Sequence, residues 1–257
     1  MEQYLFSFKN YRKLLKIIKS NGTLRDYTDV LENPESSFII LRHDVEFSPK
    51  RALELAKIEH EYDIKSTYFV QVSNNAYNIL SGKNIERLKQ IHSLGHHIGL
   101  HFHLQGSQDL EEIQRRIIFE CDMLSNILGI KIDRFSFHRP SKLVLENEIK
   151  IPGLINAYSP IFFTYTENVE DIDFKNKPKY VADSRNEWSY IAPYMEPCEE
   201  LFKTYPKVQL LCHPYTWTEN GGTKLENLKS LIEENRLEFI DTLNEETKYV
   251  KEYIDKL

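Results

Sequence analysis

Charged side chains stand where a short apolar run of the sequence ends. The segment RHDVE, residues 42–46, follows the run SFIIL, and strand alternation places Asp44 on the same side as Arg42 and Glu46. Two carboxylates and a guanidinium at one strand end lose hydration on burial unless they bind something. An isolated aspartate would be read as a surface ion pair. Because other runs end in similar groups, we predict a functional site here.

Histidines follow on a later run of the same kind. The segment GHHIGLHFH, residues 95–103, puts His101 and His103 two positions apart and therefore on one face of one strand. A lone histidine is usually structural, but two on one face have the arrangement of a chelating pair. Imidazole nitrogens select Zn²⁺ or a similar first-row ion over Mg²⁺ or Ca²⁺. We therefore predict a divalent metal site, with zinc as the ion.

Two further runs end in a histidine close to a proline. FSFHRPS, residues 135–141, brings His138 and Arg139, and LLCHPYTW, residues 210–217, brings His213. Taken alone, each histidine is equally well explained as a turn residue that hydrogen-bonds to the backbone. The segment ADSRNEWSY adds Asp183, Arg185 and Trp188. Aromatic rings near such loops stack on sugars or serve plain packing.

The elements that must position these groups are short runs rich in β-branched and aromatic residues. Each has the length and residue types of a buried strand. The runs cover residues 37–44, 66–72, 97–103, 134–138, 161–165, 179–183 and 208–213.

Helical patterns lie between these runs. One begins at Pro49 after an N-cap at Ser48, another ends at Gly95, and a third spans residues 110–128 before Gly129. A charged amphipathic stretch runs from about residue 224 to the end, and an amphipathic helix is expected at the start.

Alternating strands and helices predict a mainly parallel sheet. In a β/α barrel the carboxyl ends of the strands share one face, whereas the edge strands of an open sheet would be too far apart for these groups to cooperate. We therefore predict an α/β fold, a distorted β/α barrel of seven or eight strands, either closed or incompletely closed. No repeat or linker-like stretch divides residues 1–257, which favours a single domain.

Composition excludes several other classes of protein. The chain has 257 residues and a net charge of −6, with scattered basic residues, which argues against a nucleic-acid partner. Three cysteines without CxxC spacing indicate reduced thiols rather than a zinc finger. We find no signal peptide and no stretch long enough to span a membrane, and we expect a cytoplasmic protein.

In this order, RHDVE, GHHIGLHFH, SFHRP, ADSRNEW and LLCHP resemble the motifs of the polysaccharide deacetylase superfamily, carbohydrate esterase family 4. The closest likeness is to a cytoplasmic branch whose first motif reads His-Asp-Val-Asp, and it covers about residues 37–217. The resemblance implies a distorted barrel, a divalent metal held by one carboxylate and two histidines, and hydrolysis of an N-acyl sugar. By position, Asp44 matches the general base, His213 the general acid and His101 the first metal histidine.

The chain departs from the family's motifs at three places. The second metal histidine usually comes four residues after the first, where this chain has Gln105, and His103 is the nearest substitute. The adjacent Asp-Asp pair is absent, so Glu46 supplies the carboxylate ligand, or Asp44 binds metal and leaves the base role to another residue. His138 stands where the family usually has an aromatic residue.

The resemblance and the residues together give one set of expected roles. The expected metal ligands are Glu46, His101 and His103. The expected catalytic residues are Asp44 and His213, with His138 as an alternative proton donor. The expected substrate contacts are Arg42, Arg139, Asp183 and Trp188. The expected substrate is a nucleotide-linked, lipid-linked or free amino sugar that carries an acetyl or formyl group. Two alternatives remain: an amidohydrolase-type metal hydrolase, suggested by the HFH triplet, and a non-catalytic sugar-binding protein, suggested by Gln105.

Overall fold

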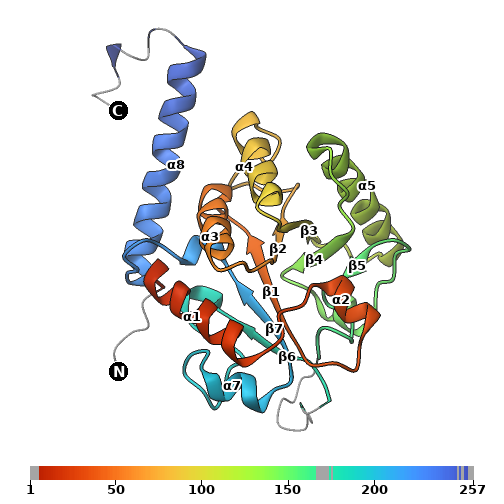
Figure 1. Ribbon diagram of the computed structural model, residues 1–257. Helices are drawn as coiled ribbons and strands as arrows, with labels where there is room; N and C mark the ends of the chain where they lie inside the picture. Colours follow the sequence, from red (N-terminus) through yellow and green to blue (C-terminus); the bar gives the residue numbers. More distant parts are fainter. Residues whose placement is uncertain (1–5, 166–173, 175, 248, 250–251, 254–257) are drawn as a thin grey trace.

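Seven parallel strands form a single curled sheet in the computed structural model, which describes residues 6–165, 174, 176–247, 249 and 252–253. The strand order is β5-β4-β3-β2-β1-β7-β6, and all six neighbouring pairs are parallel. Figure 1 shows helices packed around the sheet. The edge strands β5 and β6 do not pair with each other. The predicted distorted barrel is therefore confirmed as a seven-stranded, incompletely closed one.

The bounds of the elements follow. The strands are β1 (Phe38–Val45), β2 (Thr67–Val70), β3 (His97–His103), β4 (Arg134–His138), β5 (Ile155–Asn156), β6 (Lys179–Ala182) and β7 (Lys207–Cys212). The α-helices are α1 (Phe8–Asn21), α2 (Tyr27–Glu32), α3 (Pro49–Glu61), α4 (Gly82–Ser93), α5 (Leu110–Leu128), α6 (Lys142–Glu146), α7 (Glu199–Thr204) and α8 (Lys224–Glu246). Short 3-10 turns cover η2 (Ser184–Asn186) and η3 (Pro214–Thr216).

Six of the seven predicted strands are confirmed, and the strand at residues 161–165 is wrong. The N–H groups of Phe162 and Phe163 donate to the carbonyl of Ser159, at 2.8 and 3.0 Å, so the backbone turns instead of extending. The short strand β5 lies just before this turn. Phe162 is buried all the same, which explains why the run looks like a strand in sequence.

The predicted helix boundaries are largely confirmed. Ser48 caps α3 by accepting from the Arg51 N–H at 3.1 Å, with Pro49 in the first turn. Helix α5 ends at Gly129, whose φ of 70° is the left-handed conformation that glycine adopts without strain.

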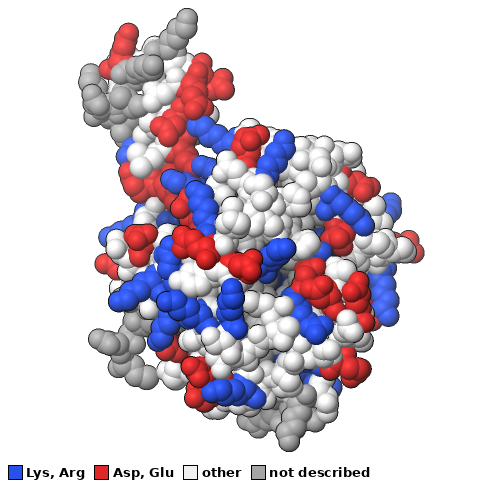
Figure 2. All heavy atoms as spheres, viewed as in Figure 1, with Lys and Arg blue, Asp and Glu red and all other residues white. Residues whose placement is uncertain are grey.

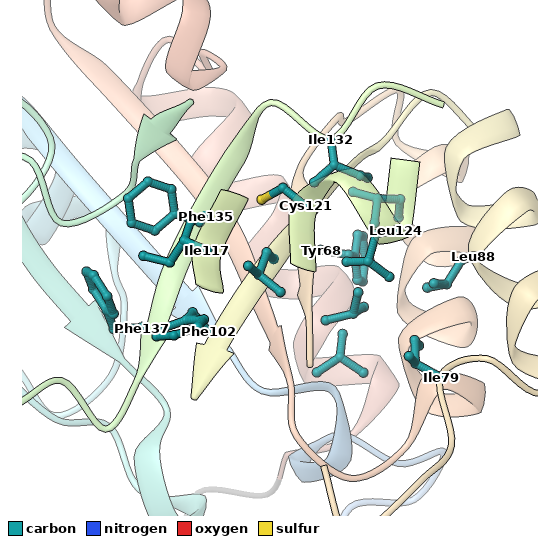
Figure 3. Close-up of a cluster of buried hydrophobic side chains, with 14 of the residues drawn as sticks. Tyr68, Ile79, Leu88, Phe102, Ile117, Cys121, Leu124, Ile132, Phe135 and Phe137 are labelled. Atoms are coloured by element: carbon teal, nitrogen blue, oxygen red, sulfur yellow. The ribbon is translucent and has the colours of Figure 1, made fainter. Parts of the chain in front are cut away.

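A large apolar cluster fills the space between strands β2 to β4 and helices α3 to α5 (Figure 3). Phe102 and Phe135 point outward from the sheet and are fully buried, as is Ile117 of α5. Burial of a side chain of this size stabilises the fold by roughly 1.5–3 kcal/mol. This outer core holds the strands in register, and the register decides which side chains meet inside the barrel.

The inner side of the sheet is plugged at its base by α2. Tyr27 of α2 packs edge-to-face against the rings of Phe69 and Phe162, at centroid distances of 6.0 and 4.8 Å. On β3, a Cβ atom added to Gly99 would lie 2.5 Å from the Phe69 ring, so only glycine fits there. These side chains therefore fill the base of the barrel, and the cavity that the described residues line lies at the carboxyl ends of the strands.

A buried carboxylate, Glu59 of α3, ties the outer face of the sheet to the helices. It is fully buried and accepts hydrogen bonds from His43 (2.6 Å), Ser66 (2.6 Å), Tyr68 (2.9 Å) and the hydroxyl of Tyr11. Burial raises the pKa of Glu59, but the charge and hydrogen bond of His43 outweigh it and lower that pKa to about 2.

Helix α8 projects away from the barrel (Figure 1), and acidic side chains are prominent along it (Figure 2). Its inner side is joined to the body by Glu234, which accepts from Arg51 at 3.1 Å, and by Glu245, which lies 3.0 Å from Lys83. Among the described helices, none combines the length and the apolar character that crossing a bilayer requires.

We expect the change Glu59→Gln to lower the free energy of unfolding by about 3 kcal/mol near neutral pH, because it leaves His43 and three hydroxyl groups facing a neutral amide in a dry interior. The folded-state pKa of about 2 lies below the unfolded value of roughly 4.3. The advantage of the parent is thus complete above about pH 5 and is lost as pH falls toward 2.

Urea unfolding across this pH range measures the difference, with Glu61→Gln on the same helix as control. Glu61 pairs with Arg12 at 3.1 Å, but the two side chains are 53% and 36% exposed. Such a surface pair contributes about 0–1 kcal/mol. Equal effects of the two changes would contradict a stabilising role for the Glu59 network.

Candidate functional site

The carboxyl ends of four strands bring the titratable groups together at the open end of the barrel. Asp44 lies at the end of β1 and Glu46 just beyond it, while His101 lies on β3, His138 ends β4 and His213 follows β7. His101 Nε2 lies 3.9 Å from Glu46 Oε1, and His213 Nε2 lies 4.0 Å from the same oxygen. The predicted common face is therefore confirmed.

Three of these groups have the arrangement of a metal site. Ligand atoms of Glu46, His101 and His138 all lie within 4.8 Å of one another, and His138 Nδ1 is 3.0 Å from Glu46 Oε1. Within the described residues, His101 Nε2 and His138 Nδ1 are buried and make no hydrogen bond of acceptable geometry. Buried nitrogens without a hydrogen bond cost free energy unless something else binds them. Two imidazoles and a carboxylate fit an ion such as Zn²⁺.

The ring of His101 is oriented from behind by a serine. His101 Nδ1 hydrogen-bonds with the hydroxyl of Ser136 at 2.8 Å, and the two residues are register partners on β3 and β4. A hydrogen bond to one ring nitrogen fixes the tautomer and directs the other nitrogen toward the metal position. Ser136 was not among the residues expected from sequence, although alternation along RFSFH places it on the same face as His138.

His103, the second histidine of the expected chelating pair, does not belong to this group of three. Its Nδ1 accepts from the Gln105 backbone N–H at 3.1 Å, and its ring stacks on His138 with centroids 5.0 Å apart. Gln105 lies in an exposed left-handed turn with a φ of 53°. His138 of the neighbouring strand, instead of His103, therefore completes the group of three with Glu46 and His101.

Asp44 is buried beside the three ligand atoms and is held by Arg42. Its Oδ2 accepts from the Arg42 guanidinium at 2.7 Å and lies 3.6 Å from His101 Nε2. Its Oδ1 is buried and has no hydrogen-bond partner among the described residues. Burial raises the pKa of Asp44, but the charges of Arg42, His101 and His213 outweigh it and hold that pKa below its usual value. The carboxylate is therefore ionised, with one oxygen free to accept a proton.

Arg42 supports Asp44 and does not face the substrate space. Its side chain has no exposed surface, and the guanidinium lies 5.3 Å from the centroid of Phe69 and 5.0 Å from that of Tyr158. It also donates to Gln209 Oε1 at 3.3 Å. Arg42 was expected to contact the substrate, but its guanidinium is buried and pairs with Asp44 instead.

Asp183 is also buried, and it forms hydrogen bonds with His213. Asp183 is unexposed and accepts from His213 Nδ1 at 2.6 Å, from the His213 backbone N–H at 2.9 Å, and from Trp217 Nε1 at 2.8 Å. Burial lowers the pKa of His213, but Asp183 outweighs it and raises that pKa to about 9. Asp183 thus positions His213, in place of the expected substrate contact, and leaves Nε2 facing the metal ligands.

A cavity of about 960 Å³ opens above these groups. Asp44, Glu46, His101 and His213 line it together with Arg139, whose contact with substrate stays a prediction. Trp188 does not line it, because its ring packs near Phe6 and Trp217 at centroid distances of 5.8 and 6.2 Å. Trp188 was expected to contact the substrate, but its ring packs with Phe6 before α1 and Trp217 after β7 instead.

Among solved structures, family 4 carbohydrate esterases align with this chain at low sequence identity. A Streptococcus mutans esterase of this family aligns at 13% identity over 93% of this chain and 91% of its own, with a TM-score of 0.46. A Bacillus anthracis esterase of the family aligns at 16% identity over 92% and 90%, with a TM-score of 0.41.

A wild-type pseudoenzyme of the same family from Bacillus anthracis aligns at 14% identity over 80% of this chain, with a TM-score of 0.43. The chain spans less than two thirds of that protein's length, 63%. No protein-family model and no curated protein matches the chain. The chemistry of the site must therefore be derived from the side chains of this chain.

We expect His138→Ala to weaken Zn²⁺ binding by more than about 100-fold, because loss of a ligand exceeds the roughly 10–100-fold cost of losing an outer partner. Titration of the chelator-treated protein with Zn²⁺ measures this. His103→Ala is the matched control and should change the affinity less than about threefold. Loss of binding in His103→Ala with retention in His138→Ala would restore the pair expected from sequence.

Proposed function

We propose that this protein is a metal-dependent hydrolase that removes an acetyl or formyl group from the nitrogen of an amino sugar. One observation carries the proposal: the ligand atoms of Glu46, His101 and His138 converge beside an ionised carboxylate and a histidine held by a buried aspartate. Hydrolysis of an amide needs these three functions, a Lewis acid, a base for water and an acid for the leaving nitrogen.

Glu46, His101 and His138 would hold the ion. Burial raises the pKa of Glu46, but the nearby rings of His101, His138 and His213 outweigh it and lower that pKa, so the carboxylate is anionic. When bound, a divalent ion polarises an acyl oxygen and lowers the pKa of water. Three protein ligands leave a coordination position open for this purpose.

Asp44 is the proposed general base. Asp44 lines the cavity; its Oδ1 is buried and has no hydrogen-bond partner among the described residues, whereas Oδ2 is fixed by Arg42. This division leaves one oxygen to take the proton of the attacking water while the ion pair prevents the carboxylate from turning away. Roles for Asp44 as base and Glu46 as ligand follow from their different neighbours, because Glu46 lies nearer His138 and Asp44 is tied to Arg42.

His213 is the proposed general acid. Asp183 on Nδ1 favours the protonated ring, so Nε2 carries the proton that the departing sugar nitrogen needs. Aromatic rings at the mouth support a sugar substrate: Phe47 and Tyr215 both line the cavity, with centroids 4.8 Å apart at nearly right angles. Arg139, which also lines the cavity, can hold the oxygen on which negative charge develops.

We expect Asp44→Asn to lower turnover of an N-acetyl amino sugar by roughly 10²–10⁴-fold while metal content stays near that of the parent. The amide keeps the size of the side chain but cannot accept the proton of water. Glu46→Gln should instead lose metal, and activity as a consequence. Metal analysis and release of acetate, measured on the same preparations, separate the two outcomes.

Asp63→Asn, in the exposed turn after α3, serves as the control and should behave as the parent does. If Asp44→Asn empties the metal site while Glu46→Gln keeps it full, the two roles are exchanged. Full activity in both variants would exclude the proposed deacylase mechanism.

The role of Asp183 gives a separate expectation. Asp183→Asn should lower amide hydrolysis by roughly 10²-fold, because His213 loses the partner that orients and charges it. Hydrolysis of p-nitrophenyl acetate should fall much less, since the phenolate leaves without a proton. Kinetics with both substrates at equal metal content test this. An equal loss on amide and ester would show that Asp183 acts only on folding or metal binding.

A further inference from the structure

A continuous row of aromatic rings lines the cavity where the barrel is open between β5 and β6. Tyr158 packs against Phe163 at 4.8 Å between centroids, Phe163 against Tyr180 at 5.1 Å, and Tyr180 against Tyr190 at 5.6 Å. All four line the cavity, as does Phe137, which lies 6.0 Å from Tyr158. The row thus extends from beside the metal ligand His138 to Tyr190, whose side chain is 63% exposed.

Two arginines stand on either side of this aromatic row. Arg139 directly follows His138 at the end of β4, and Arg185 lies two residues after Asp183, just past β6. Both line the cavity and both are exposed. Among the described residues, neither guanidinium has an ion pair or a hydrogen bond. Glu187 also lines the cavity, and its carboxylate forms an ion pair with Lys224 at 2.5 Å.

These side chains are held there at a conformational cost. Arg139, Arg185 and Tyr190 have φ angles of 48°, 61° and 61°, the left-handed region that non-glycine residues seldom adopt. Each such residue costs on the order of 1–3 kcal/mol, and these outliers cluster where ligands bind. Three strained residues that line the same cavity therefore indicate a binding surface beyond the metal site.

We propose that this wall binds a nucleoside diphosphate, and that the substrate is an amino sugar linked to it. Arginine guanidinium groups bind phosphate oxygens in pairs of hydrogen bonds, and aromatic rings stack on nucleobases. The cavity volume of about 960 Å³ lies at the upper end of the roughly 300–1,000 Å³ that drug-sized ligands occupy. A monosaccharide alone would leave most of it empty. The identity of the substrate, though not the binding itself, rests on the proposed hydrolase function.

Binding of uridine, cytidine, adenosine, guanosine and thymidine 5′-diphosphates by calorimetry tests the proposal without requiring turnover. At least one should bind about 10-fold more tightly than its nucleoside or than pyrophosphate alone, because each part contributes separately. Arg139→Ala and Arg185→Ala should each weaken that diphosphate by about 10-fold or more. Tyr190→Ala should weaken the diphosphate and the nucleoside but leave pyrophosphate unchanged.

Arg115→Ala on α5 and Tyr249→Ala are the matched controls, since both residues are exposed and neither lines the cavity. His101→Ala should keep nucleotide binding; its loss there would place the phosphates on the metal and overturn the proposal. Tighter binding of farnesyl diphosphate than of every nucleotide would overturn it in favour of a lipid-linked sugar. Nucleotide binding without release of acetate or formate from any linked sugar would refute the hydrolase function while leaving this site intact.

Discussion

The ion pair of Arg42 with Asp44 joins the reactive end of the barrel to its base. A guanidinium without exposed surface is tolerated only because Asp44, Gln209 and two aromatic faces replace its water. Gln209 in turn accepts from the hydroxyl of Tyr27 at 2.6 Å, on the helix that plugs the barrel. The fold itself therefore holds Asp44 in place and keeps its pKa below the usual value.

Strand β1 lies between β2 and β7. Polar side chains on its two faces belong to two separate hydrogen-bond networks. Asp44 points into the barrel, whereas the adjacent His43 points outward to Glu59 and to the carbonyl of Cys212 at 3.2 Å. Alternation along one strand thus separates a network that holds the helices from one that faces the cavity. A one-residue slip of β1 would exchange the two, so the outer core that sets the register also protects the site.

Sequence patterns predicted the barrel because strand lengths, helix caps and titratable strand ends all agree on one architecture. The same patterns did not predict local turns. The aromatic run at residues 161–165 has the composition of a strand, but hydrogen bonds to the Ser159 carbonyl turn its backbone. Asp44, Glu46, His101 and His213 lie together at the open end, where their positions at strand ends predict them, while their chemical roles stay predictions. The buried roles of Arg42 and Asp183 were not predictable, because exposure of a charged side chain depends on partners that are far away in sequence.

The position of His138 could not be predicted from residue spacing within one strand, because it depends on which strands pair with each other. Spacing within GHHIGLHFH describes a single strand, and on that basis His103 is the natural second imidazole. In a barrel, the neighbouring strand contributes side chains at the same level, and β4 pairs with β3 so that His138 is the register partner of His103. The position that the family motif would fill falls here at Gln105, in a left-handed turn whose amide N–H occupies His103 Nδ1. An imidazole from β4 therefore reaches Glu46 and His101, and the ligand set proposed here depends on strand pairing as well as on spacing within one strand.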